Sequence, residues 1–164
     1  MTFFRSIFQL NFFAGLLLIS ILVFSCSSKD KQVAVLDYSI EKMNLNNNSM
    51  DVVFTITNST SIGFKENEWS LHWNQILGEP LAESLPKGID FERVNGNSYF
   101  IVEFGDSWSL EAGESISFKV VTKGIMSRLP LGPRGAFVVT SNQSIDVHTN
   151  IHWQEAVFVG VRAF

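Results

Sequence analysis

Apolar and polar residues alternate along several short stretches of this chain. Every second residue is apolar from residue 50 to 57, and the same period recurs over residues 116–120 and 145–151. A period of two with one apolar face is typical of half-buried β-strands. No long segment repeats with a helical period, so we expect an all-β domain. The inward positions would be Met50, Val52, Phe54, Ile56, Ile116, Phe118, Val120, Ile145, Val147, Thr149 and Ile151.

Turn-forming residues separate the predicted strands. Asn95-Gly96 lies between strand-like residues 89–94 and 98–104, which predicts a two-residue type I′ hairpin because both central positions need positive φ. An irregular connection is expected around Pro130, Pro133 and Gly135, before residues 137–140. The pattern amounts to about seven or eight strands, as in an immunoglobulin-like antiparallel β-sandwich of about 100 residues.

Composition excludes some function classes. Of the 164 residues, 46% are hydrophobic and 17% are charged, so the chain is able to bury a core. The formal net charge is −4, and no cluster of Lys or Arg is present. Phosphate binding needs concentrated positive charge, so we expect no nucleic-acid partner. No motif indicates a cofactor.

The first residues have the pattern of a secretory signal. Arg5 precedes an apolar run from residue 12 to 24, and Ser25-Cys26 follows. The stretch Val23-Phe24-Ser25-Cys26 resembles a bacterial lipobox, in which the cysteine is diacylated and becomes the new N-terminus. The alternatives are an ordinary signal peptide with a chance cysteine, or an anchor helix, although the run is shorter than the roughly 20 residues of a membrane span.

These features predict three segments. They are a lipoprotein signal peptide (1–25), a polar tether (26–32) and one β-sandwich domain (33–164). The lipid on Cys26 would hold the protein at the cell envelope. Ser27, rather than Asp, follows the cysteine, which favours the outer membrane.

Residues 68–76 read Glu-Trp-Ser-Leu-His-Trp-Asn-Gln-Ile. They resemble a strand, Trp-x-Leu-Tyr-Phe-x-Gln-Ile, of the N-terminal domain of chitobiases and β-N-acetylhexosaminidases, with His72-Trp73 in place of the usual Tyr-Phe. Other stretches resemble further parts of that domain in the same order, and the resemblance covers residues 36–150. These stretches are Val52–Asn58, Phe91–Asn97, Leu110–Ser115 and Leu131–Arg134.

The resemblance implies a two-sheet sandwich, as in bacterial cellulose-binding domains. In the resembling enzymes this module precedes a second small domain and a (β/α)₈ barrel, which takes about 250 residues. Those enzymes use an adjacent Asp-Glu pair in catalysis, and this chain contains no Asp-Glu dipeptide. We therefore expect a non-catalytic module rather than an enzyme.

Two pairs of residues are candidates for catalytic or metal chemistry. Asp90 and Glu92 share a predicted strand face and would lie about 6.6 Å apart. That separation overlaps the distance between the two catalytic carboxylates of inverting glycosidases, but a solvent-exposed strand face is the simpler interpretation. His148 and His152 would lie about 13 Å apart on a strand, too far to share a metal ion. We predict neither a catalytic nor a metal site.

Tryptophan suggests carbohydrate binding, because its broad apolar face stacks on sugar rings. Trp69 and Trp153 are expected in the core, whereas Trp73 and Trp108 are open to either interpretation. The candidate ligand-binding residues are Trp73, Trp108, Asn74, Gln75 and Asn97, the amides serving as partners for sugar hydroxyls.

Two functions therefore compete. The first is a lipid-anchored module that binds chitin-like or N-acetylhexosamine glycans. The second is a docking module, or the remnant of a truncated β-N-acetylhexosaminidase, which would show an exposed apolar patch for a protein partner. The apolar stretch 156–164 would be either a final edge strand or a tail left by truncation.

Overall fold

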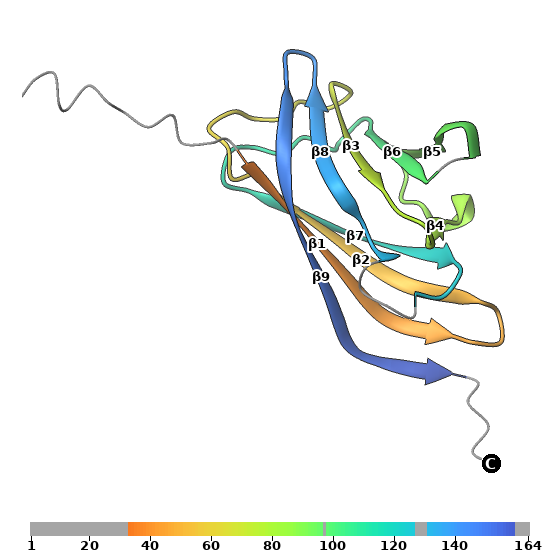
Figure 1. Ribbon diagram of the computed structural model, residues 1–164. Helices are drawn as coiled ribbons and strands as arrows, with labels where there is room; N and C mark the ends of the chain where they lie inside the picture. The colour runs from red at the N-terminus through yellow and green to blue at the C-terminus, as the bar shows by residue number, and fades with distance from the viewer. Residues whose placement is uncertain (1–32, 97, 127–130, 160–164) are drawn as a thin grey trace, which may run out of the picture. The chain divides into compact units, whose positions relative to one another are not determined.

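The computed structural model describes residues 33–96, 98–126 and 131–159, which form a β-sandwich (Figure 1). The predicted signal peptide, the lipidation site Cys26, the tether and the candidate residue Asn97 lie outside the described residues. No helix in the described ranges is long and apolar enough to cross a membrane.

Nine strands and two short 3₁₀ turns make up this part of the chain. The turns are η1 (Ala82–Ser84) and η2 (Val94–Gly96). The strands are β1 (Val33–Asn44), β2 (Ser49–Thr57), β3 (Trp69–Asn74), β4 (Glu79–Pro80), β5 (Ile89–Arg93), β6 (Tyr99–Phe104), β7 (Ser115–Lys123), β8 (Arg134–Thr140) and β9 (Ser144–Val159).

The strands are hydrogen-bonded in the order β4-β7-β2-β1-β9-β8-β3-β6-β5 and form two layers (Figure 1). The long strand β9 pairs with β1 and, over its first residues, with β8, so it joins the two layers. The all-β sandwich is confirmed. One ladder differs from the predicted antiparallel pattern, because β1 and β9 run parallel. Parallel partners need a long connection, and here almost the whole domain separates the two strands.

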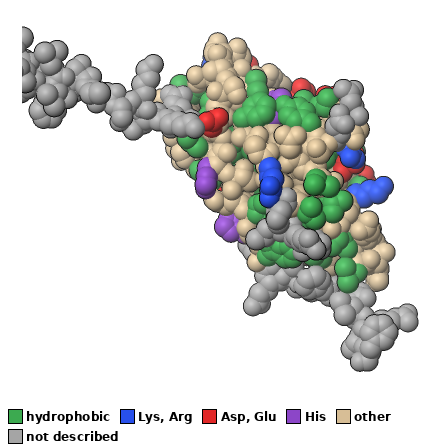
Figure 2. All heavy atoms as spheres, in the orientation of Figure 1, with side chains coloured by type: hydrophobic (Ala, Val, Ile, Leu, Met, Phe, Trp, Pro, Cys, Tyr) green, Lys and Arg blue, Asp and Glu red, His purple; other side chains and the backbone are tan. Residues whose placement is uncertain are grey.

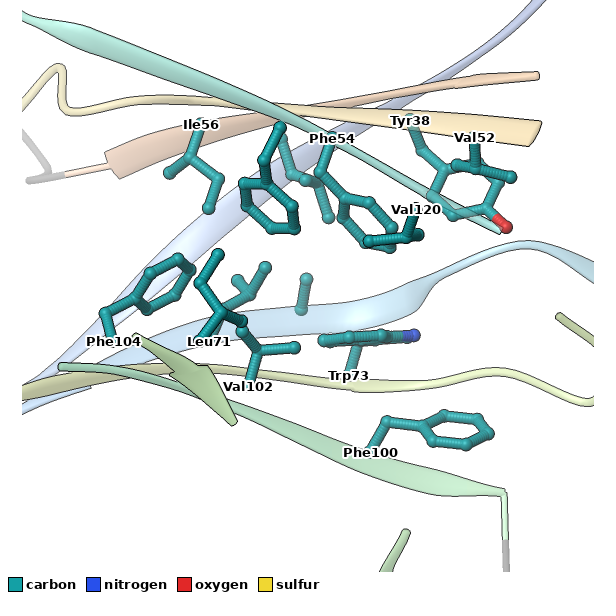
Figure 3. Packing of buried hydrophobic residues seen from close by; sticks show 14 of the residues in the cluster. Tyr38, Val52, Phe54, Ile56, Leu71, Trp73, Phe100, Val102, Phe104 and Val120 are labelled. Atoms are coloured by element: carbon teal, nitrogen blue, oxygen red, sulfur yellow. The ribbon is translucent and has the colours of Figure 1, made fainter. Parts of the chain in front are cut away.

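The core lies between the layers, as the alternation predicts. Met50, Val52, Phe54 and Ile56 of β2 are all buried, and the polar residues between them face outward. Phe54 reaches across to the opposite layer, where its ring centroid lies 5.6 Å from that of Trp73 (Figure 3). The two layers therefore interlock through aromatic rings from β2 and β3.

The predicted hairpin between β5 and β6 exists, but its turn is different. A two-residue Asn95-Gly96 turn would pair Val94 with residue 97, whereas the structure pairs Arg93 with Phe100. The chain turns through η2 instead, in which Gly96 has a positive φ of 67°. The longer loop keeps Phe100 and Val102 facing the core, which decides the register.

Two expectations about the C-terminal part are also modified. Gly135, expected in the irregular connection, lies inside β8 with φ of 57°. Residues 156–159 continue β9 rather than form a separate strand, and Val159 pairs with Asn44. Residues 160–164 lie outside the described part of the chain.

Candidate functional site

Trp73 and Gln75, two of the predicted ligand-binding residues, belong to the core. Trp73 is 0% exposed, and its indole Nε1 donates a hydrogen bond to Gln75 Oε1 at 2.9 Å. The Gln75 amide donates in turn to the Tyr38 hydroxyl at 3.2 Å and to the Leu77 carbonyl. Burial raises the pKa of Tyr38 to about 12, so the hydroxyl stays protonated. Both side chains are buried because the second layer covers the inward face of β3.

Asn74 and Trp108, the other predicted residues in the described part of the chain, do not come together. Asn74 is exposed at the end of β3, where it pairs with Tyr99. Trp108 follows β6, and its carbonyl accepts a hydrogen bond from Trp69 Nε1 at the opposite end of β3. Five residues of strand separate these ends, a distance of about 17 Å. Asn74 and Trp108 therefore cannot contact one sugar ring.

Trp108 is half-buried in the gap between the two layers. Its indole packs edge-on against Phe118 of β7, with centroids 5.8 Å apart, and at 6.1 Å from Phe104 of β6. The indole Nε1 donates to the Lys87 carbonyl at 2.9 Å. Gly88 lies so close that a Cβ there would approach the indole to 3.2 Å. These contacts hold the ring in one orientation.

A groove of about 900 Å³ opens beside this ring, and we call it the Trp108 groove. It is within the usual size of small-molecule sites. Its polar lining combines hydrogen-bond donors and acceptors around one aromatic ring. Besides Trp108, the lining residues are Asn67, Lys87, Gly88, Gly105, Asp106, Ser107, Ile116 and Ser117.

Hydrogen bonds between loops order one wall of the groove. Asn67 Nδ2 donates to Asp106 Oδ1 at 2.8 Å, and the Ser107 backbone N–H donates to Glu66 Oε2 at 3.0 Å. Asn67 and Ser107 have positive φ values of 60° and 70°, conformations that non-glycine residues seldom adopt. Sequence reasoning identified Trp108 but missed Asn67, Asp106 and Lys87, which come from three separate loops.

A second polar cluster surrounds His72 on the outer face of β3. Its two ring nitrogens lie 2.7 Å from the Ser70 and Tyr99 hydroxyls, and its ring stacks on Phe137 with centroids 4.9 Å apart. Figure 2 shows hydrophobic side chains gathered over this part of the molecule. Burial lowers the pKa of His72 and the charge of Glu103 partly opposes this shift, so the ring favours its neutral form.

The other histidines and carboxylates considered as candidate chemistry lie on outward-facing strand positions. His152 Nε2 lies 3.1 Å from Asp37 Oδ1 on the outer face of β1 and β9. His148 is exposed on β9, four residues before His152. Asp90 and Glu92 are exposed on β5. Within the described ranges no three His, Cys, Asp or Glu side chains are grouped to hold a metal ion.

No tryptophan forms an exposed aromatic strip in the described part of the chain. Trp69 is 3% exposed, and Trp153 packs against the core, as expected for both. Among the described residues, the large apolar side chains that are exposed are aliphatic: Leu45 at 43%, Ile76 at 65% and Leu77 at 36%. Leu45 lies in the β1–β2 turn, and Ile76 and Leu77 follow β3. All three residues therefore lie at one end of the sandwich, and Trp108 lies at the other end.

Comparisons with known proteins show where this architecture recurs. No family model matches the chain, and no curated protein matches it. An inactive variant of the GH20 exo-β-N-acetylglucosaminidase from Vibrio harveyi aligns with a TM-score of 0.59 and 13% identity, over 73% of this chain and 18% of that one. The same enzyme in complex with N-acetylglucosamine aligns with a TM-score of 0.54 and 13% identity, over 75% and 19%.

A family IIIA CBD from Clostridium cellulolyticum aligns with a TM-score of 0.44 and 13% identity, over 73% of this chain and 99% of that one. The chain thus spans less than a fifth of the length of the Vibrio enzyme. At 13% identity the likeness to that enzyme concerns the fold: this chain is a two-layer β-sandwich of a kind also built into a GH20 glycosidase.

Proposed function

We propose that this protein is a non-catalytic glycan-binding module that a lipid on Cys26 anchors at the cell envelope, in the outer membrane. The Trp108 groove would hold the sugar. It is the place in the described chain where a fixed, partly accessible indole meets a concave polar lining. That combination suits a pyranose, which has an apolar face and a rim of hydroxyl groups.

The composition of the groove supports an uncharged sugar ring as its occupant. Lys87 and Asp106 supply one charge of each sign, while Asn67, Ser107 and Ser117 supply neutral donors and acceptors. The shared fold with an exo-β-N-acetylglucosaminidase supports N-acetylhexosamine glycans as the first class to test. Chitin-like oligosaccharides are the simplest members of that class.

The binding test blocks the groove without disturbing the core. Ser117 is exposed on β7 and lines the groove, so Ser117→Arg would fill it. Ser115 is also exposed on the same face of β7 and does not line the groove, so Ser115→Arg is a matched control. The full-length protein in detergent would be titrated with N-acetylated chito-oligosaccharides by calorimetry.

We expect saturable binding by the wild-type protein and by Ser115→Arg, and at least a tenfold loss of affinity in Ser117→Arg. Trp108→Ala should also abolish binding, although the loss of its contacts with Phe104 and Phe118 lowers stability as well. Equal binding by both arginine variants would exclude this groove. No binding by a folded wild-type protein at millimolar sugar would reject the glycan-binding function.

Lipid anchoring has a separate test. Cys26→Ser removes the thiol that would be acylated, so the protein should move from the membrane fraction to the soluble fraction of the envelope. A variant that stays in the membrane fraction would contradict the lipoprotein proposal. Sugar binding need not change in either case, because Cys26 precedes the described domain.

Protein docking is the second candidate function, and one observation favours it. Ile76 and Leu77 are exposed on a turn that the buried Gln75 side chain holds through the Leu77 carbonyl. Exposed aliphatic residues on a rigid turn suit contact with a protein partner. If this function is correct, Ile76→Ser should release a partner cross-linked to the wild-type protein in cells, and Ser117→Arg should not.

A further inference from the structure

A second hollow adjoins the Trp108 groove. Its volume is about 490 Å³, and it shares Asn67 and Gly105 with the groove. The hydrogen bond between Asn67 and Asp106 stands where the two depressions meet. Because the two depressions share these lining residues, a glycan in the Trp108 groove would lie next to the second hollow.

The second hollow differs from the groove in its charge. No Lys, Arg or His lines it, whereas three carboxylates do. The remaining lining includes amide and hydroxyl groups able to bind sugar hydroxyls. The lining residues are Asn67, Glu68, Trp69, Ser70, Asp90, Glu103, Phe104, Gly105, Val139, Thr140 and Ser141.

Two of the carboxylates face each other. Asp90 of β5 and Glu103 of β6 are paired across the ladder, on the exposed face of the layer. Like charges in directly opposed positions are destabilising. Neither carboxylate has a hydrogen bond or an ion pair in the described ranges. Glu68 accepts a hydrogen bond from Ser141 Oγ at 3.3 Å. The neighbouring His72 favours its neutral form, so it does not offset these charges.

We propose that the second hollow binds the protonated amine of an amino sugar, so that the preferred ligand is a glycan with at least one free amino group beside N-acetylated residues. The inference rests on the proposed glycan-binding function and specifies its ligand. A sugar ammonium placed between Asp90 and Glu103 would remove their mutual repulsion. Ser70 and Thr140 would bind its hydroxyls. An N-acetyl group, which carries no charge, would leave the repulsion in place.

The test compares two ligands of equal length. The full-length protein in detergent is titrated at low salt with a fully N-acetylated chito-oligosaccharide and with its partly de-N-acetylated counterpart. We expect the amine-bearing ligand to bind about fivefold more tightly, as for one or two partly exposed ion pairs. Raising the salt concentration should reduce this preference.

Three variants locate the effect. Asp90→Asn and Glu103→Gln should each lower the preference for the amine-bearing ligand over the N-acetylated ligand. Glu83→Gln is the matched control, because Glu83 is exposed in η1 and does not line the hollow. It changes the net charge equally and should not alter the preference.

The outcomes separate this inference from the proposed function. If both ligands bind equally in the wild-type protein, the free-amine inference is wrong and glycan binding stands. If Glu83→Gln lowers the preference as much as Asp90→Asn, general attraction explains the effect and the hollow is not the site. If neither ligand binds, the proposed function itself fails, and the inference fails with it.

Discussion

Trp73, near the end of β3, and Gln75, just beyond it, are joined by a buried hydrogen bond of 2.9 Å between indole Nε1 and amide Oε1. The amide nitrogen of Gln75 continues the network to Tyr38 on the opposite layer. A polar network of this kind is stable in a core only when its members find partners. The pair therefore links the two layers and orders the turn that carries Ile76 and Leu77.

Gln75→Leu should destabilise the fold. It keeps the side-chain volume but leaves the Trp73 indole and the Tyr38 hydroxyl without partners, at a cost of about 2 kcal/mol in the free energy of unfolding. Urea denaturation would measure this value. Asn74→Ala, one residue earlier and exposed, should change it by less than about 0.5 kcal/mol. Adding Trp73→Phe to Gln75→Leu should cost less than the sum of the two single changes, because they remove the same hydrogen bond.

Phe54→Ala should be among the costliest core substitutions. The Phe54 ring lies 5.0 Å from Tyr38, 5.6 Å from Trp73 and 5.3 Å from Phe118, measured between centroids. Removing a ring that packs between both layers leaves a cavity and should cost about 3–5 kcal/mol. Thr55→Ala, on the outward face of the same strand, should cost less than about 1 kcal/mol. Similar values for both variants in thermal unfolding would contradict this packing.

Asp90→Asn should stabilise the folded protein. Asp90 is paired with Glu103 across the β5–β6 ladder, and removal of one charge relieves a repulsion of about 0.2–1 kcal/mol. The gain should shrink as salt screens the repulsion. Unfolding at two salt concentrations, with Glu83→Gln for comparison, would measure both effects. A loss of stability in Asp90→Asn would show that the carboxylate has a stabilising partner.

His72 should make stability depend on pH. Burial lowers its pKa below the ordinary value of 6.5, so the unfolded chain binds the proton more tightly than the folded protein does. The contribution of the neutral ring is complete above pH 6.5 and is lost as the pH falls through the folded-state pKa. His72→Gln should therefore lose less stability than the wild-type protein between pH 7.5 and pH 5.

The control for this pH dependence is His148→Gln, since His148 is exposed on β9. Its stability should follow that of the wild-type protein over the same pH range. Parallel curves for all three proteins would show that His72 does not titrate differently on folding.

The sequence alone determined which class of fold forms and which side of several strands faces inward. Alternation over residues 50–57 was sufficient, because strand geometry places successive side chains on opposite faces whatever their neighbours are. The Asn95-Gly96 pair, a second local signal, located the β5–β6 hairpin. It did not determine the length of the turn, since the register is set by where Phe100 and Val102 find the core.

Accessibility at the candidate site was decided by the tertiary structure. Trp73 and Trp108 are equally aromatic in sequence, yet the opposite layer covers Trp73, while Trp108 lies in the gap between layers beside Lys87 and Gly88. The pairing of β1 with β9, and the joining of Asn67 to Asp106, also connect segments far apart in the chain. Local periodicity specifies the face of a strand, but only packing between distant segments decides which side chains the solvent reaches.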